Sequence, residues 1–323
     1  MMRHARLFPV LTAGIILWIG GAAAQSEAKL PQIGMLVWSS CGEDPDLTAG
    51  LADWDRVPGK NVEIVCESAG SRYEGLTQAA KKLLDQKVDV IVTSSQPAGR
   101  AAHEVTQTIP IVTIISGDPV GGGLANSLAK PGGNLTGVTY YATELTGKRL
   151  EILKEAVPAL GVIGVLANPD LSYLPFEGDT KRAAAILHIR PIFAYVRDPS
   201  EFADAFRRMK SEGAEAVFVL PDLVLAQNGQ EIADLALASK LPGMSWGTWF
   251  TQQGMMMGYS ADYGAMTRRL GFYVDQVLRG VPPGELPIEQ PRNFILSINV
   301  KTAQKLGITL PQSLLSRADM VIE

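Results

Sequence analysis

Short apolar runs alternate with amphipathic helical stretches along most of this chain, and this alternation restricts the fold more than any other feature of the sequence. Strands are predicted at the apolar runs, 33–39, 62–66, 88–94, 109–116, 162–167, 192–196, 216–220 and 255–259. Helices are predicted around them, at 73–86, 97–107, 146–156, 179–187, 199–212, 231–240 and 263–278. In the first helix, Leu76, Ala79 and Leu83 recur at the spacing of one buried face. Because the strand runs are continuously apolar, they indicate parallel strands covered by helices on both faces.

The alternation runs through the chain twice, which predicts two α/β units in tandem. The length of 323 residues agrees, because it exceeds what one core usually fills. A Gly/Asn-rich stretch at 130–136 lies near the expected boundary. The tail, 294–323, holds one more strand, a helix at 300–306 and a closing segment. It is too short to fold alone, so we expect it to pack on one of the two units.

The first 24 residues have the layout of a secretory signal peptide. A basic start at 3–6 precedes an uncharged apolar run at 7–21, and the alanines at 22–24 offer a cleavage site. The apolar run is shorter than the roughly 20 residues that a membrane span needs, which favours cleavage over anchoring. The residue after the cut is Gln25 and not the cysteine that a lipid anchor would need. We therefore expect a soluble, exported mature chain in the periplasm, with no membrane insertion.

Charge and cysteine content narrow the classes of partner and cofactor. Without Arg3 and Arg6 the chain has 27 basic and 33 acidic residues, a net charge near −6. Nucleic acids and anionic lipids require a basic face, so neither is expected as a partner. Two cysteines remain, each near the C-terminal end of one of the first two predicted strands. Two outcomes stay open, a Cys41–Cys66 disulfide in an oxidising compartment or two free thiols.

Metal and catalytic signatures are scarce. Only His103 and His188 could complete a zinc site with the two cysteines, so no metal or other cofactor is expected. Neither histidine is predicted at a strand end, where a general base would be useful. The chain has no G-x-S-x-G, H-E-x-x-H or G-x-x-x-x-G-K-[ST] motif, and the glycines at 121–123 fit no dinucleotide fingerprint. We therefore expect a protein that is not an enzyme.

Candidate ligand-binding residues stand where the predicted strands end, because α/β sheets bind ligands beyond the C-terminal ends of their strands. In the first unit these residues are Trp38, Ser39, Ser40, Ser95, Gln96, Gly117 and Asp118. In the second unit they are Asn168, Asp222 and Trp246, and Tyr140 lies near the expected crossing between units. Hydroxyl, amide and N–H groups suit a carboxylate, Asp222 suits an ammonium group, and aromatic rings suit an apolar ligand body. Helix capping and core packing are the alternative roles for these residues.

Several segments resemble a known family. They lie at 88–92, 108–112, 117–121, 128–137, 147–155, 299–303 and 315–319. The most specific is the string Ala-Lys-Pro-Gly-Gly-Asn-Leu-Thr-Gly at 129–137. In these segments the chain resembles the ABC transporter substrate-binding protein family related to the tryptophan-binding TrpX proteins, and the resemblance runs over nearly the whole mature chain.

The resemblance implies a type I periplasmic-binding-protein fold, in which two α/β lobes are joined by three hinge crossings. The N-terminal lobe would take 31–140 plus 263–290, and the C-terminal lobe 141–262 plus 291–323. Members of the family capture a small solute, often an amino acid, and deliver it to a membrane permease. By position, the resemblance assigns the ligand carboxylate to Ser39, Ser95, Gln96 and Asp118, and the opposite wall to Asn168, Asp222 and Trp246.

One segment departs from the family pattern. A longer amphipathic helix usually follows the first strand, whereas residues 41–59 are polar, acidic and irregular here, with only 47–54 predicted as a helix. The ligand is therefore not carried over from relatives. The favoured function is a monomeric periplasmic receptor of an ABC importer, binding an aromatic or branched amino acid, or an aromatic carboxylate. The alternatives are an exported hydrolase-type enzyme and a sensor subunit that presents its closed form to a signalling receptor.

Overall fold

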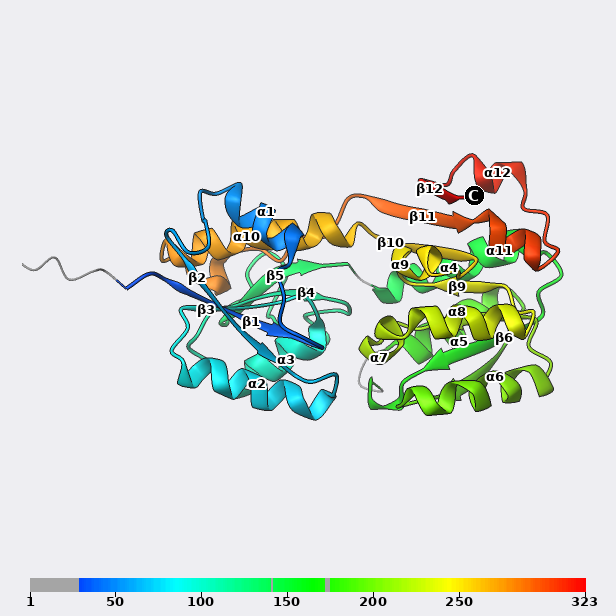
Figure 1. Ribbon diagram of the computed structural model, residues 1–323, viewed down its shortest axis with the longest axis horizontal. Coiled ribbons are helices and arrows are strands. Elements are labelled where there is room, and N and C mark those ends of the chain that lie inside the picture. The colour runs from blue at the N-terminus through cyan, green and yellow to red at the C-terminus, as the bar shows by residue number, and fades with distance from the viewer. Residues whose placement is uncertain (1–28, 141, 172–174) are drawn as a thin grey trace, which may run out of the picture. The chain divides into compact units, whose positions relative to one another are not determined.

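A computed structural model describes residues 29–140, 142–171 and 175–323 (Figure 1). The predicted signal peptide, 1–24, lies outside the described residues. Pro31–Glu323 forms one compact unit, which contains two β-sheets. We call the first sheet with its helices the N-lobe and the second sheet with its helices the C-lobe.

The N-lobe sheet has five parallel strands in the order β2-β1-β3-β4-β5. The strands are β1 (Gln32–Val37), β2 (Glu63–Ser68), β3 (Val90–Thr93), β4 (Ile111–Ile115) and β5 (Leu135–Thr139). The helices are α1 (Pro45–Ala52), α2 (Tyr73–Asp85), α3 (Gln96–Val105) and α10 (Tyr263–Leu278). Helices α1 and α10 cover one face of this sheet, and α2 and α3 cover the other. Val90 and Val92 pack on the α1/α10 side, and Ile91 packs on the α2/α3 side, which explains the continuously apolar strands.

The C-lobe sheet has seven strands in the order β12-β11-β10-β9-β8-β6-β7, all parallel except the β10–β11 pair. The strands are β6 (Val162–Ala167), β7 (Arg190–Tyr195), β8 (Ala216–Val219), β9 (Gly243–Ser245), β10 (Met257–Ala261), β11 (Phe294–Asn299) and β12 (Met320–Ile322). Helices α4 (Ala142–Ala156) and α5 (Phe176–Ile186) cover one face, and α6 (Phe202–Ser211) and α8 (Gly229–Ala238) cover the other. The short helices are α7 (Leu223–Gln227), α9 (Thr248–Gln252), α11 (Val300–Lys305) and α12 (Gln312–Leu315).

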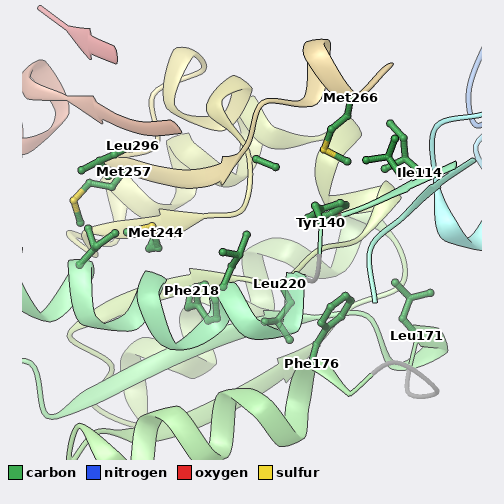
Figure 2. Close-up of a cluster of buried hydrophobic side chains, with 14 of the residues drawn as sticks. Ile114, Tyr140, Leu171, Phe176, Phe218, Leu220, Met244, Met257, Met266 and Leu296 are labelled. Carbon is green, nitrogen blue, oxygen red and sulfur yellow. The ribbon is translucent and has the colours of Figure 1, made fainter. Parts of the chain in front are cut away.

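The chain passes between the two lobes three times. It leaves the N-lobe after β5, returns after β10 to form α10, and crosses again before β11. Buried apolar side chains continue through these crossings (Figure 2). In that figure Ile114 of β4 and Met266 of α10 lie near Tyr140, which directly follows β5, while Phe218 and Leu220 come from the C-lobe. Two sheets with helices on both faces confirm the predicted α/β class.

Every strand predicted from an apolar run is present, with ends that differ by up to two residues. Three further strands, β5, β9 and β12, were not predicted, and β12 falls in the closing segment of the tail. Strand β5 reads Leu-Thr-Gly-Val-Thr, and its glycine is required, because a Cβ at Gly137 would collide with the backbone carbonyl of Thr113 on β4. Strand β9 has three residues, which is too short for a recognisable run. The predicted helix at 47–54 is α1, shifted by two residues at each end.

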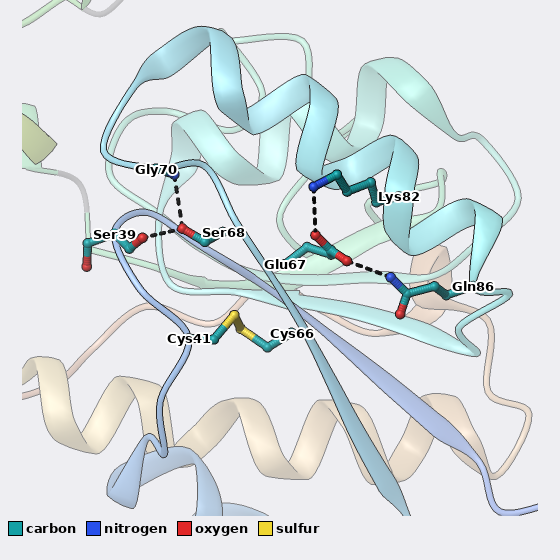
Figure 3. The surroundings of a disulfide bond; sticks show 8 residues. All are labelled: Ser39, Cys41, Cys66, Glu67, Ser68, Gly70, Lys82 and Gln86. Atoms are coloured by element: carbon teal, nitrogen blue, oxygen red, sulfur yellow. Dashed lines mark hydrogen bonds and ion pairs between the residues drawn. A yellow bond between two sulfur atoms is a disulfide. The ribbon is translucent and has the colours of Figure 1, made fainter.

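A disulfide joins Cys41, in the segment that follows β1, to Cys66 in β2 (Figure 3). Parallel pairing places Cys66 opposite Met35 of β1, so the bond closes a loop of 25 residues at the edge of the sheet. Nearby, Ser68 donates its hydroxyl hydrogen to the carbonyl of Ser39 and accepts from the N–H of Gly70 at 3.0 Å. The irregular segment after β1 is therefore fixed to β2 and to the turn that follows it.

Helices α1 and α10 cross at two glycines, although they are more than 200 residues apart in the sequence. A Cβ at Gly271 would collide with the backbone of Gly50, and a Cβ at Gly50 would collide with the carbonyl of Arg268. The contact is completed by a buried carboxylate, Asp275, which accepts from Arg56 Nε at 2.9 Å. The two helix backbones can approach this closely only because neither position carries a side chain.

We predict that Gly271→Ala lowers the free energy of unfolding by about 1–3 kcal/mol, because the added methyl group forces the two helices apart. Chemical denaturation followed by circular dichroism measures the change. Gly147→Ala is the matched control: this glycine is also inside a helix, but the nearest atom to an added Cβ is Ala183 Cβ at 3.9 Å. The control should be neutral or more stable by up to about 1 kcal/mol. Equal effects of the two substitutions would contradict the assignment of a close helix crossing.

Candidate functional site

A cavity lies where strands of both lobes reach their C-terminal ends. Its lining residues lie near the ends of strands β3, β4 and β5 of the N-lobe and β6, β8, β9 and β10 of the C-lobe, or in the segments that follow these strands. They are Ser95, Gln96, Pro97, Ile114, Ser116, Tyr140, Leu171, Pro221, Asp222, Leu223, Trp246 and Tyr263. The space between these atoms is about 360 Å³, part of which opens to solvent.

Gln96, the first residue of α3, forms part of the N-lobe wall with a fixed amide. Ser95 caps the helix by accepting from the N–H of Ala98. The Gln96 side chain, 1% exposed, accepts at Oε1 from the Ser116 hydroxyl at 3.0 Å and from the Gly117 N–H at 2.6 Å. These two donors fix which end of the amide is oxygen. The Gln96 Nε2 group is left as a buried donor with no acceptor among the described residues.

Tyr140 continues the N-lobe wall as a buried neutral phenol. Burial raises the pKa of Tyr140 well above its usual value, against the opposing effects of Arg149 and of a hydrogen bond with Ser116. Arg149, on α4, is fully buried and donates from Nε to the carbonyl of Tyr259 at 2.8 Å. Burial lowers the pKa of Arg149 to about 10, so its guanidinium stays charged at neutral pH. A positive charge therefore stands near the Tyr140 side of the cavity.

Asp222 is the carboxylate of the C-lobe wall, and it is 4% exposed. It is the N-cap of α7, with Oδ1 accepting from the Leu225 N–H at 2.7 Å. Its Oδ2 accepts from Asn168 Nδ2 at 2.9 Å and from the Tyr73 hydroxyl at 2.6 Å. Burial raises the pKa of the Asp222 carboxyl, and the hydrogen bonds from Tyr73, Leu225 and Asn168 act in the opposite direction. These donors allow a carboxylate to be buried here.

Aromatic rings from both lobes complete the wall of the cavity. Trp246, 5% exposed, meets Trp249 edge to face with ring centroids 4.8 Å apart. Tyr263, the first residue of α10, has its ring 6.0 Å from Tyr140 and 5.8 Å from Trp249, and it donates to the carbonyl of Ser94. Trp246 Nε1 is a second buried donor for which the described residues provide no acceptor. Each lobe thus contributes one such N–H group from a residue that lines the cavity.

The structure brings five of the predicted site residues to this cavity: Ser95, Gln96, Tyr140, Asp222 and Trp246. Two more stand directly behind it, since Gly117 donates to Gln96 and Asn168 donates to Asp222. Ser39, Ser40 and Asp118 are exposed and do not line it. Trp38 does not line it either: its Nε1 donates to Gln227 Oε1 of the C-lobe at 2.9 Å. The ligand-binding roles of all these residues remain predictions.

Sequence reasoning missed Tyr73, Leu171, Leu223 and Tyr263. Leu223 directly follows Asp222, and Tyr263 is the first residue of a predicted helix, so inspecting helix starts would have found them. Tyr73 begins α2, five residues after β2 ends, and nothing local to its segment indicates a contact with the other lobe.

Comparison with known proteins places the chain in a family. Residues 45–322 match the family model described as ABC transporter substrate binding protein, and the chain belongs to this family, as predicted. A tyrosine-binding protein of Clostridioides difficile (strain R20291) is 25% identical over 259 residues, which cover 80% of this chain and 74% of that protein.

Two solved structures are similar in fold over 91% of this chain and all of theirs. One is a conserved domain protein from Vibrio cholerae O1 biovar El Tor, 27% identical with a TM-score of 0.82. The other is an ABC domain from Streptococcus pneumoniae in complex with L-Trp, 25% identical with a TM-score of 0.79. This similarity confirms the type I periplasmic-binding-protein fold.

Two features are absent from the described part of the chain. None of its helices combines the length and apolar character needed to cross a membrane. Within the same residues, no group of three or more His, Cys, Asp and Glu side chains is arranged to hold a metal ion.

We predict that Asp222→Ala lowers the free energy of unfolding by about 2 kcal/mol, because α7 loses its cap and two buried donors lose their acceptor. Chemical denaturation of purified protein gives the value. Asp118→Ala is the control, since Asp118 is exposed and accepts only a local bond from the Val120 N–H at 2.9 Å. Its effect should stay within about 0.5 kcal/mol. If the two variants were equally stable, Asp222 would not have the structural role described here.

Proposed function

We propose that this protein captures an aromatic L-amino acid in the periplasm and delivers it to an ABC permease. The observation that carries the proposal is the pairing of opposite chemistries in one cavity. Gln96 and Trp246 contribute two buried N–H donors that have no acceptor among the described residues, and Asp222 contributes a buried carboxylate. A zwitterion with an apolar side chain complements all three groups.

The N–H groups of Gln96 and Trp246 bind the carboxylate of the proposed ligand. A buried N–H group without an acceptor costs about 1–3 kcal/mol, and a carboxylate supplies strong acceptors to both. The hydroxyl of Ser116 is less suited to this role, because its hydrogen already goes to Gln96 Oε1. The two N–H groups are therefore available as donors to a ligand.

Asp222 distinguishes an amino acid from a simple aromatic acid. Among the described residues that line the cavity there is no lysine, arginine or histidine, and Asp222 is the acidic side chain there. A ligand that carries only a carboxylate would bring a second negative charge close to Asp222, which is unfavourable at low dielectric. An ammonium group on the same ligand removes this cost. The charges thus favour the amino acid over the aromatic carboxylate.

The apolar part of the lining favours an aromatic side chain. Ile114, Leu171 and Leu223 offer aliphatic surface, and Tyr140, Trp246 and Tyr263 offer ring surface with polar tips. Two relatives point in the same direction: one is named a tyrosine-binding protein, and one was solved with L-Trp. Neither His103 nor His188 lines the cavity, so the geometry adds no support to a hydrolase.

Location outside the cytoplasm is supported by two independent features. The signal-peptide layout at 1–24 predicts export, and the Cys41–Cys66 disulfide suits an oxidising compartment. Proteins of this family are typically extracytoplasmic and work with a membrane permease, which provides the proposed partner.

The test is ligand binding by residues 25–323, unfolded and refolded to remove any molecule carried through purification. Calorimetry and thermal unfolding are followed with L-Tyr, L-Trp, L-Phe, L-Leu, tyramine, 3-(4-hydroxyphenyl)propanoate and glucose. An aromatic L-amino acid at 100 times its dissociation constant should add about 2.7 kcal/mol of stability. Tyramine and the propanoate, which each lack one charge, should bind far more weakly. Binding of glucose alone, or of no compound, would contradict the proposal.

We predict that Gln96→Glu weakens binding of L-Tyr by at least about 100-fold. The new side chain still accepts from Ser116 and Gly117, but it replaces the N–H donor with an anionic oxygen that faces the ligand carboxylate. Tyramine, which has no carboxylate, should bind no more weakly than it does to the unaltered protein. Ser40→Ala is the control, since Ser40 is exposed and away from the cavity. Unchanged affinity for L-Tyr in Gln96→Glu would exclude the proposed carboxylate site.

A further inference from the structure

Two aromatic side chains of the N-lobe reach across to helix α7 of the C-lobe. Trp38, the residue after β1, donates from Nε1 to Gln227 Oε1 at 2.9 Å. Tyr73, the first residue of α2, donates its hydroxyl hydrogen to Asp222 Oδ2 at 2.6 Å. Asp222 is the N-cap of α7 and Gln227 is its last residue. The pair therefore contacts both ends of this helix, and we call Trp38 and Tyr73 the aromatic clasp.

The aromatic clasp is held in place within its own lobe. The two rings lie 4.8 Å apart at an angle of 54°. The turn between them, after β2, uses left-handed backbone at Gly70 and Ser71, with φ of 63° and 60°. The Ser71 N–H donates to the carbonyl of Trp38 at 2.9 Å, and the nearby disulfide fixes the segment after Trp38 (Figure 3). Contacts within the N-lobe thus help to orient both side chains toward the C-lobe.

The two hydrogen bonds of the aromatic clasp end on residues in different positions relative to the cavity. Neither Trp38 nor Gln227 lines the cavity, so their bond affects only how the lobes hold together. The Tyr73 hydroxyl ends on the carboxylate that lines the cavity, and it also accepts from the Leu223 N–H at 3.3 Å. A hydroxyl that donates to a carboxylate stabilises the ionised form, which opposes the effect of burial on Asp222.

We propose that Tyr73 is a specificity-determining residue: it completes the ammonium site of the proposed ligand by holding Asp222 ionised and oriented from the opposite lobe. Trp38 contributes to the contact between the lobes but does not affect the selection of a ligand with an amino group. Because Tyr73 and Asp222 belong to different lobes, the site that selects an amino group is complete only when the lobes are in contact. Discrimination between an amino acid and the corresponding acid is then coupled to closure. This inference rests on the proposed function.

The experiment compares two ligands that differ by one amino group, L-Tyr and 3-(4-hydroxyphenyl)propanoate, in the unaltered protein and in two single variants. Tyr73→Phe keeps the ring that contacts Trp38 and removes one hydroxyl. It should weaken L-Tyr binding by about tenfold or more, which is the range for a hydrogen bond to a charged group, and change propanoate binding less than threefold. Trp38→Phe is the matched control: it removes the bond to Gln227 and should weaken both ligands by the same factor.

Asp222→Asn provides a second test that does not depend on Tyr73→Phe folding well. Asn still caps α7 but cannot pair with an ammonium group, so the preference for L-Tyr over the propanoate should be lost. In this background Tyr73→Phe should bring no further change in the preference. Competition calorimetry supplies the weak constants, and the thermal midpoint of each variant reports its folding.

The outcomes separate this inference from the proposed function. If Tyr73→Phe weakens both ligands by the same factor, as Trp38→Phe does, Tyr73 only holds the lobes together and the inference is wrong, while the proposed function stands. If Asp222→Asn retains the preference for L-Tyr, the ammonium site lies elsewhere and the inference is also overturned. If the unaltered protein binds no amino acid, the proposed function fails, and the inference fails with it.

Discussion

The buried carboxylate of Asp222 sets the requirement that the surrounding structure has to meet. An ionised group in a protein interior needs donors for its oxygens, because leaving it unsatisfied costs several kcal/mol. Asn168 and the α7 backbone supply them from the C-lobe, and Tyr73 supplies one from the N-lobe. The Asp222 side chain therefore accepts hydrogen bonds from the start of α7, from the residue after β6 and from the start of α2. It belongs both to the cavity wall and to the contact between lobes.

The charges around the cavity are few, and they stand on opposite sides. Asp222 is on the C-lobe wall, and Arg149 is buried close to Tyr140. Between them the cavity presents N–H groups, phenols and aliphatic carbon instead of further ions. A site of this kind discriminates by the position of each charge on a ligand and not by net charge, since a misplaced charge would be buried without a partner. The proposed zwitterion matches this arrangement.

The sequence predicted the fold better than it predicted the site, for physical reasons. Strands such as β3, β4 and β8 are buried on both faces, so their composition alone identifies them. Strand β5 has no continuous apolar run in its sequence. It contains Gly137 because its backbone lies too close to Thr113 of β4 for a side chain. At the site, Gln96 and Asp222 were predicted from their places after strands. Tyr73 was not predicted, because it contacts Leu223 of the other lobe, which lies 150 residues later in the sequence.

The glycine crossing of α1 and α10 has a consequence for the order of folding. The face of the N-lobe sheet that α10 covers stays open until the chain has been synthesised as far as residue 278, although its five strands end at residue 139. The C-lobe strands β6 to β10 are complete by residue 261 and are inserted between the two parts of the N-lobe. The lobe that begins the chain is therefore finished late, through contacts of very long sequence separation, and such contacts make folding slow.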